Sequence, residues 1–204
     1  MRPDELTTGL VLGREARGER TVRLETLTPE GWLRPLKRVS AKGAGIVPDL
    51  FDTAEMRRSG RSHFLDEYRP VVRRPQISQR YAVFHHACQW AAFWVANIPL
   101  MEFDAALYDH GTKVADALAA GRRPATVVLK SLYWLARREG YAVNASWLGS
   151  LEPAFAEAAG HCLRQPLEVL PENELEGKAL LDSLSQWLAR QSDFTLPPAF
   201  GVAP

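Results

Sequence analysis

The chain has 204 residues, which is enough for one large domain or two small ones. Its 46% hydrophobic and 24% charged residues are typical of a globular protein, and no uninterrupted apolar run is long enough to cross a membrane. The two cysteines, Cys88 and Cys162, argue against a disulfide framework and favour a reducing cytoplasm, and no apolar signal core follows the N-terminus, so we expect no export.

Charge is distributed unevenly along the chain, although the formal net charge is only +1. Residues 1–80 carry 16 Lys/Arg against 11 Asp/Glu, whereas residues 81–204 carry 9 against 13. Such asymmetry suggests that the two parts face different partners. A basic first part is compatible with phosphate binding through counterion release, and equally with a solvated surface of ordinary charge scatter.

The first 74 residues predict short β-strands separated by turns. Period-2 alternation is clearest at Val22, Leu24 and Thr26, and Pro35 indicates an edge or a bulge in its strand. The predicted strands are 8–13, 22–26, 32–39, 50–56 and 63–72. Five short strands at near-regular spacing predict an OB-fold barrel over residues 1–74, a fold that commonly binds oligonucleotides.

From Pro75 the apolar period changes to that of helices. Ile77, Tyr81 and Phe84 begin one apolar stripe, and a second stripe beside it contains Trp90 and Trp94, so this helix is expected to be central and buried. Further helices are predicted over 103–119, 124–139, 144–151, from Pro153, and around 180–188. The period change predicts a domain boundary near residue 75, with a helical bundle over 75–204 and an α+β fold class. The tryptophans predicted in its core are Trp90, Trp94, Trp134, Trp147 and Trp187.

The order of these elements resembles the bacterial DNA-repair mediator family RecO over roughly residues 6–145. The similarity is carried by an apolar strand and polar turn, a Thr-Pro-Glu-Gly turn, an Ala-Lys-Gly-Ala loop and a helix that ends in Gly-Tyr. These are the segments 9–12, 17–19, 27–31, 41–44 and 129–141. Two departures stand out: the loop continues as Gly45–Asp49 without basic residues, and Ala142–Ser146 contains none of the cysteines that bind zinc in many members.

The resemblance implies a non-catalytic protein that binds single- and double-stranded DNA, promotes strand annealing and assists RecA loading. RecR and the C-terminal tail of the single-stranded-DNA-binding protein would be its partners, and no cofactor, zinc module or membrane contact is implied. The expected location is the cytoplasm, in association with the nucleoid. Two alternatives stay open: an adaptor that keeps the OB-fold with little DNA affinity, and an enzyme with an unrecognised site in the helical part.

Basic side chains on the predicted barrel are the candidates for DNA contact, because nucleic acid needs a positive groove and aromatic faces for stacking. Trp32 and Phe64 are the aromatic candidates, with packing at a barrel end as the alternative for Trp32. The predicted DNA-binding residues are Arg14, Arg17, Arg20, Trp32, Arg34, Lys37, Arg38, Lys42, Arg57, Arg58 and Arg61. The resemblance also implies a groove for a partner peptide on the helical domain, where Arg122, Arg123 and Lys130 could hold a carboxylate.

A metal site is a weaker hypothesis. His85 and Cys88 could share a helix face, with His86 beside them, and His161-Cys162 offers two more ligand types. A structural zinc site needs four converging ligands, and neighbouring residues on a helix diverge by about 100°. Buried thiols and hydrogen-bonded histidines are therefore the favoured interpretation, and we predict no metal and no catalytic residue.

Overall fold

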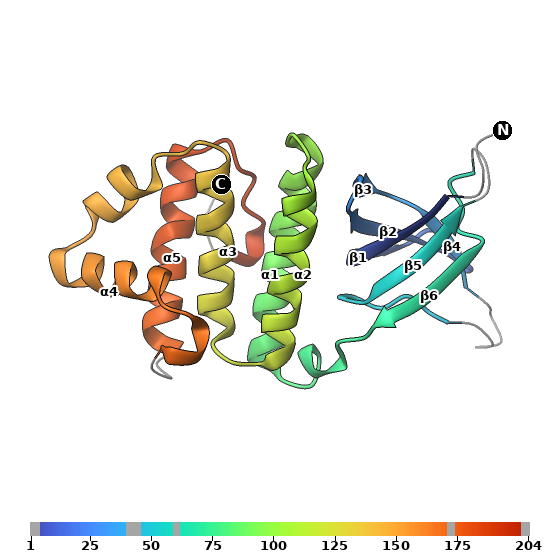
Figure 1. Cartoon of the computed structure of the whole chain (residues 1–204), viewed down its shortest axis with the longest axis horizontal. Helices are drawn as coiled ribbons and strands as arrows, with labels where there is room; N and C mark the ends of the chain where they lie inside the picture. The colour runs from blue at the N-terminus through green and yellow to red at the C-terminus, as the bar shows by residue number, and fades with distance from the viewer. Residues whose placement is uncertain (1–4, 40–45, 59–61, 171–173, 201–204) are drawn as a thin grey trace. The chain divides into compact units, whose positions relative to one another are not determined.

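The computed structural model describes residues 5–39, 46–58, 62–170 and 174–200. The fold is α+β, with an N-terminal antiparallel sheet followed by helices (Figure 1). Residue contacts divide the chain into two compact units. The sheet unit contains residues 1–75 and 94–116, and the helical unit contains residues 76–93 and 117–204. The change from strands to helices lies near residue 75, but the segment 94–116 belongs with the sheet.

The sheet unit contains a six-stranded sheet with the order β3-β2-β1-β5-β6, in which β4 also pairs with β2. The strands are β1 (Glu5–Ala16), β2 (Thr21–Thr28), β3 (Gly31–Leu33), β4 (Leu36–Arg38), β5 (Thr53–Arg58) and β6 (Glu67–Val72). All five pairings of these strands are antiparallel. The long strand β1 is therefore central, because it pairs with β2 on one side and with β5 on the other.

Pro35 explains why the predicted third strand is two strands. β3 and β4 both pair with β2, on either side of Pro35, which has no N–H to give to a ladder. Its carbonyl still accepts a hydrogen bond from the Leu24 N–H at 2.9 Å. The prediction of five strands was therefore wrong by one, because a proline interrupts the ladder without separating the chain from β2.

The sheet is not closed into a barrel, so the structure supports the α+β class and not the finer barrel assignment. One isolated parallel bridge joins Leu36 of β4 to Phe64, just before β6. At this bridge the Leu36 N–H donates to the His63 carbonyl, and the Leu65 N–H donates to the Leu36 carbonyl, both at 2.8 Å. The segment just before β6 is thus linked to β4 at one position by two hydrogen bonds.

Each face of the sheet has its own packing. One face carries a buried cluster made of Val11, Leu24, Ala54, Met56, Leu65 and Tyr68. Leu27 of β2 is also fully buried but is not a member of this cluster. A Cβ placed on Gly111 would lie 2.9 Å from Leu27 and 3.0 Å from Trp94, so the missing side chain allows the segment 94–116 to approach β2 closely.

The five long helices lie close to their predicted ranges. They are α1 (Tyr81–Asn97), α2 (Ala105–Ala120), α3 (Pro124–Arg138), α4 (Pro153–Arg164) and α5 (Glu174–Gln191). Pro124 and Pro153 begin α3 and α4, as expected of a residue whose missing N–H needs no partner there. A π-helical turn covers Asn144–Leu148, and short 3-10 turns cover Pro75–Ile77, Ile98–Leu100, Leu167–Val169 and Pro198–Phe200. No helix in the described ranges is long and apolar enough to span a membrane.

The two apolar stripes of α1 are buried to different extents. Trp90 and Trp94 are fully buried, and the Trp90 indole donates to the Ser131 hydroxyl at 3.1 Å. Tyr81, however, is 83% exposed and Phe84 is 38% exposed. The expectation of a helix buried around most of its circumference was therefore wrong for its first turns. Of the other predicted core tryptophans, Trp147 is buried, whereas Trp134 and Trp187 are half-buried.

Candidate nucleic-acid interface and a pocket in the helical unit

The predicted DNA-binding residues fall into two groups: some form ion pairs with carboxylates of the sheet, and others do not. Three arginines form ion pairs with carboxylates of the sheet: Arg17 with Glu15, Arg34 with Glu25, and Arg57 with Glu67. All three arginine side chains are 41% or more exposed, so solvent screens these pairs and each contributes little to stability. Each carboxylate nevertheless offsets the positive charge that a phosphate would meet.

The carboxylate of Glu25 on β2 contacts three side chains, those of Arg23, Trp32 and Arg34. This carboxylate is only 9% exposed and accepts hydrogen bonds from the Trp32 indole at 2.9 Å and from the Arg34 Nε at 2.8 Å. The Arg23 Nε lies 3.5 Å from its other oxygen. Trp32 was expected either to stack on bases or to pack at the end of the barrel. The structure leaves it half-buried, with its indole nitrogen hydrogen-bonded to Glu25, which agrees with the second interpretation.

A second group of basic side chains lies where β2 begins and β4 ends. Arg38 stacks on the Phe64 ring with its guanidinium carbon 4.7 Å from the ring centroid. Lys37 precedes Arg38 on β4, so the two side chains leave opposite faces of the strand. The Val39 N–H donates to the Arg20 carbonyl at 3.0 Å, which places the backbone of Arg20 beside the end of β4. Within the part of the chain that the structure describes, the side chains of Arg20, Lys37 and Arg38 form no ion pair. We call Arg20, Lys37, Arg38 and Phe64 the β2–β4 basic cluster.

The remaining candidates on the sheet are not part of this cluster. Arg14 donates to the Pro48 carbonyl at 3.0 Å, and Arg58 lies half-buried at the end of β5 with an interaction of its own. Lys42 and Arg61 lie outside the described residues. The strand pattern alone did not identify Arg23 or Glu25, because it places charged residues on a solvent face without showing which ones meet across neighbouring strands.

In the helical unit, two of the three predicted peptide-binding residues hold the chain's own backbone. Arg123 is 8% exposed, and its guanidinium donates to the carbonyls of Leu167 and Leu170. Lys130 donates to the Gln165 carbonyl, and burial lowers the pKa of its ammonium. Both cations therefore fix the segment between α4 and α5. Arg122, in contrast, is exposed.

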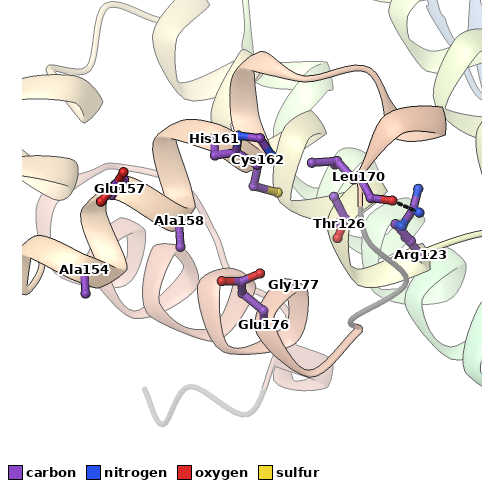
Figure 2. A pocket seen from close by; sticks show the side chains of 10 residues that line it. All are labelled: Arg123, Thr126, Ala154, Glu157, Ala158, His161, Cys162, Leu170, Glu176 and Gly177. Atoms are coloured by element: carbon purple, nitrogen blue, oxygen red, sulfur yellow. Dashed lines mark hydrogen bonds between the residues drawn. The ribbon is translucent and has the colours of Figure 1, made fainter.

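A pocket of about 340 Å³ opens beside this segment, between α4 and the first turns of α3 and α5 (Figure 2). Glu176 and the Cys162 thiol lie toward its centre, as Figure 2 shows. A Cβ on Gly177 would lie 2.3 Å from the Thr126 Oγ1, so α3 and α5 approach each other here only because residue 177 is glycine. The lining is of mixed polarity: Arg123, Thr126, Ala154, Glu157, Ala158, His161, Cys162, Leu170, Glu176 and Gly177.

The histidines and cysteines do not converge. Among the described residues, no group of three or more His, Cys, Asp or Glu side chains could hold a metal ion. The His85 ring stacks on Tyr81, and His86 shares a hydrogen bond of 2.7 Å with Gln89. Burial raises the pKa of the Cys88 thiol, which disfavours the reactive thiolate.

Comparison with known proteins adds no relative. No protein family model matches the chain, and no curated protein matches it significantly. The resemblance to the RecO family therefore stays a prediction.

Proposed function

We propose that this chain is a non-catalytic mediator of recombinational DNA repair, similar to RecO proteins, that binds single- and double-stranded DNA through its sheet unit. The observation that carries the proposal is the β2–β4 basic cluster. It places the Arg38 guanidinium over the Phe64 ring, with Arg20 and Lys37 at neighbouring backbone positions, and none of the three forms an ion pair among the described residues. Cations and flat rings together are what proteins use to bind nucleic acid strands without reading sequence.

The sheet order supports the further proposal of a partly opened OB-fold. β1 pairs with β2 and β5, β5 pairs with β6, and the parallel bridge between Leu36 and Phe64 joins β4, which pairs with β2, to the segment just before β6. OB-folds bind oligonucleotides on the face of their second and third strands and on the adjoining loops. In such a fold the β2–β4 basic cluster would lie in the corresponding region, because Arg20 ends the β1–β2 turn and β4 pairs with β2.

The magnitude of the salt effect follows from the number of cations. Each phosphate that a cation neutralises contributes roughly −0.7 to the slope of log affinity against log salt for a single strand. Three contacts from Arg20, Lys37 and Arg38 therefore contribute about −2 to this slope. Arg17, Arg34 and Arg57 contribute less, because a phosphate must compete with the carboxylate that each already contacts.

The resemblance extends the proposal to partners and location. Strand annealing and RecA loading would then depend on RecR and on the tail of the single-stranded-DNA-binding protein, in the cytoplasm near the nucleoid. Arg122 is the exposed cation among the three residues proposed to hold that tail. Arg123 and Lys130 would act by fixing the segment that borders the pocket.

A second function is favoured by a specific observation. Three candidate arginines are paired with Glu15, Glu25 and Glu67, which lowers the positive charge of the sheet surface. An adaptor that keeps this fold and contacts proteins instead of DNA would show such pairing. The two functions differ in the salt dependence of DNA binding, because phosphate contacts release counterions.

The test is a titration of a labelled single-stranded oligonucleotide at about 50 mM and about 200 mM salt, where phosphate contacts show their dependence. The triple variant Arg20→Ala, Lys37→Ala, Arg38→Ala is expected to weaken binding and to reduce the salt slope by about 2. Arg57→Ala is the matched control, because this arginine is paired with Glu67. Wild-type protein that binds no oligonucleotide at low salt would favour the adaptor.

A further inference from the structure

The first turns of α1 expose an aromatic face in the helical unit. Tyr81 is 83% exposed, Phe84 is 38% exposed, and His85 is exposed as well. These positions are three and four residues apart and so share one side of the helix. The rings of Tyr81 and His85 are stacked, with centroids 6.0 Å apart and an angle of 20° between their planes. Contiguous exposed apolar surface on a helix is a common mark of a binding site.

A guanidinium is fixed at the start of this face. Arg80 precedes α1, and its Nη1 donates to the Gly121 carbonyl at 3.0 Å. Gly121 has a φ of +72°, and a Cβ there would lie 2.4 Å from the Arg80 Nη2. The turn between α2 and α3 therefore seats the guanidinium because glycine provides both the left-handed backbone and the space. Arg122, which is exposed, follows directly in the same turn.

The charge around this face favours an anionic partner. α1 contains no Asp or Glu, and the first turn of α3 contains none either. From α5, Lys178 and Asp182 both act on His86, with opposite effects on its pKa, so their charges offset one another there. Arg80 directly precedes Tyr81, and Arg122 follows the glycine that holds the Arg80 guanidinium, so both residues lie near the start of a helix that contains no carboxylate of its own.

We propose that the α1 aromatic face, defined as Arg80, Tyr81, Phe84, His85 and Arg122, is a second contact for single-stranded nucleic acid. Bases stack on Tyr81 and His85, while Arg80 and Arg122 contact phosphates. Exposed flat rings beside guanidinium groups suit a strand whose bases are unpaired, because every base offers a ring to stack and a phosphate to neutralise. An acidic peptide has the charge but not the series of flat rings.

This face belongs entirely to the helical unit, so it can be tested separately from the β2–β4 basic cluster. The probe is a labelled oligothymidylate of about 20 nucleotides, which is long enough to cover more than one OB-sized site. Tyr81→Ala is expected to weaken binding about tenfold, the effect of losing one stacked base, whereas Tyr81→Phe retains affinity. Leu175→Ala on α5 is the matched control, because Leu175 is 81% exposed and lies outside this face.

Salt dependence distinguishes stacking from charge. Tyr81→Ala should lower affinity at every salt concentration without changing the salt slope, while Arg80→Ala with Arg122→Ala should reduce the slope by about 1.4. Photocrosslinking of a thiothymidine oligonucleotide should label a peptide containing Tyr81 or Phe84. The same crosslink in the triple variant of the β2–β4 basic cluster would show that the two contacts act separately.

Three results would overturn the inference. The first is wild-type affinity in Tyr81→Ala combined with His85→Ala. The second is crosslinking confined to the sheet unit while that unit binds DNA normally, which would remove this contact but leave the proposed function intact. The third is binding of a glutamate-rich peptide that Tyr81→Ala weakens while oligonucleotide affinity is unchanged, which would assign the face to a protein partner.

Discussion

His110 should make the stability of the sheet unit depend on pH. This residue of α2 stacks on Trp94, with ring centroids 6.0 Å apart and planes 14° apart. Burial, with a smaller contribution from Lys113, lowers the pKa of His110 from 6.5 to about 4. The folded state therefore holds His110 neutral at pH values where the unfolded chain would already bind a proton.

The sign and size of the effect follow from this difference. Because the folded pKa is lowered, the stabilisation is present above about pH 6.5 and is lost as the pH falls toward about 4. One pKa unit corresponds to about 1.4 kcal/mol, so the full difference sets an upper limit of about 3 kcal/mol. The half-buried side chain retains some contact with water, and we expect a loss of about 2 kcal/mol.

The perturbation is His110→Phe, which keeps a ring against Trp94 and removes the titrating group. The free energy of unfolding should be measured by urea denaturation of both proteins, followed by tryptophan fluorescence, at several pH values in this window. Wild-type protein should lose about 2 kcal/mol more than the variant as the pH falls from about 6.5 to about 4. Parallel curves for the two proteins would refute the reasoning, because they would mean that His110 titrates alike when folded and unfolded.

Other predictions follow from single buried contacts. Burial raises the pKa of Asp52, so wild-type protein should gain stability relative to Asp52→Asn as the pH falls through that raised pKa, in the same urea assay. Gly177→Ala should cost about 1–3 kcal/mol by thermal or urea unfolding, and adding Thr126→Ala should recover part of the loss, because the new Cβ meets the Thr126 Oγ1. Glu25→Gln should raise oligonucleotide affinity several-fold in the salt titration, because it removes the negative charge beside Arg34; unchanged affinity would place Arg34 outside the interface.

The sequence alone determined the class and order of the elements. Alternation along 22–26 predicted a strand, and the change to helical periodicity near residue 75 predicted the helices that follow. The strand was expected to be half-buried, but residues 24–28 of β2 are buried on both faces. Pro124 identified the start of α3. These features are local: they depend on the spacing of apolar residues along the chain and on backbone restrictions at proline, which act wherever the segment lies.

Only the tertiary structure decided which candidates can act together. The sequence presented Arg34 and Arg38 as equivalent cations, but strand pairing places Arg34 against Glu25 and Arg38 over Phe64. Helical periodicity likewise treated Tyr81 as a core residue, although the structure leaves it exposed. Partners nine or more residues apart meet only through register and packing, and neither is encoded in the spacing of any one segment. The charge available to a phosphate is therefore a property of the fold, whereas the number of arginines is a property of the sequence.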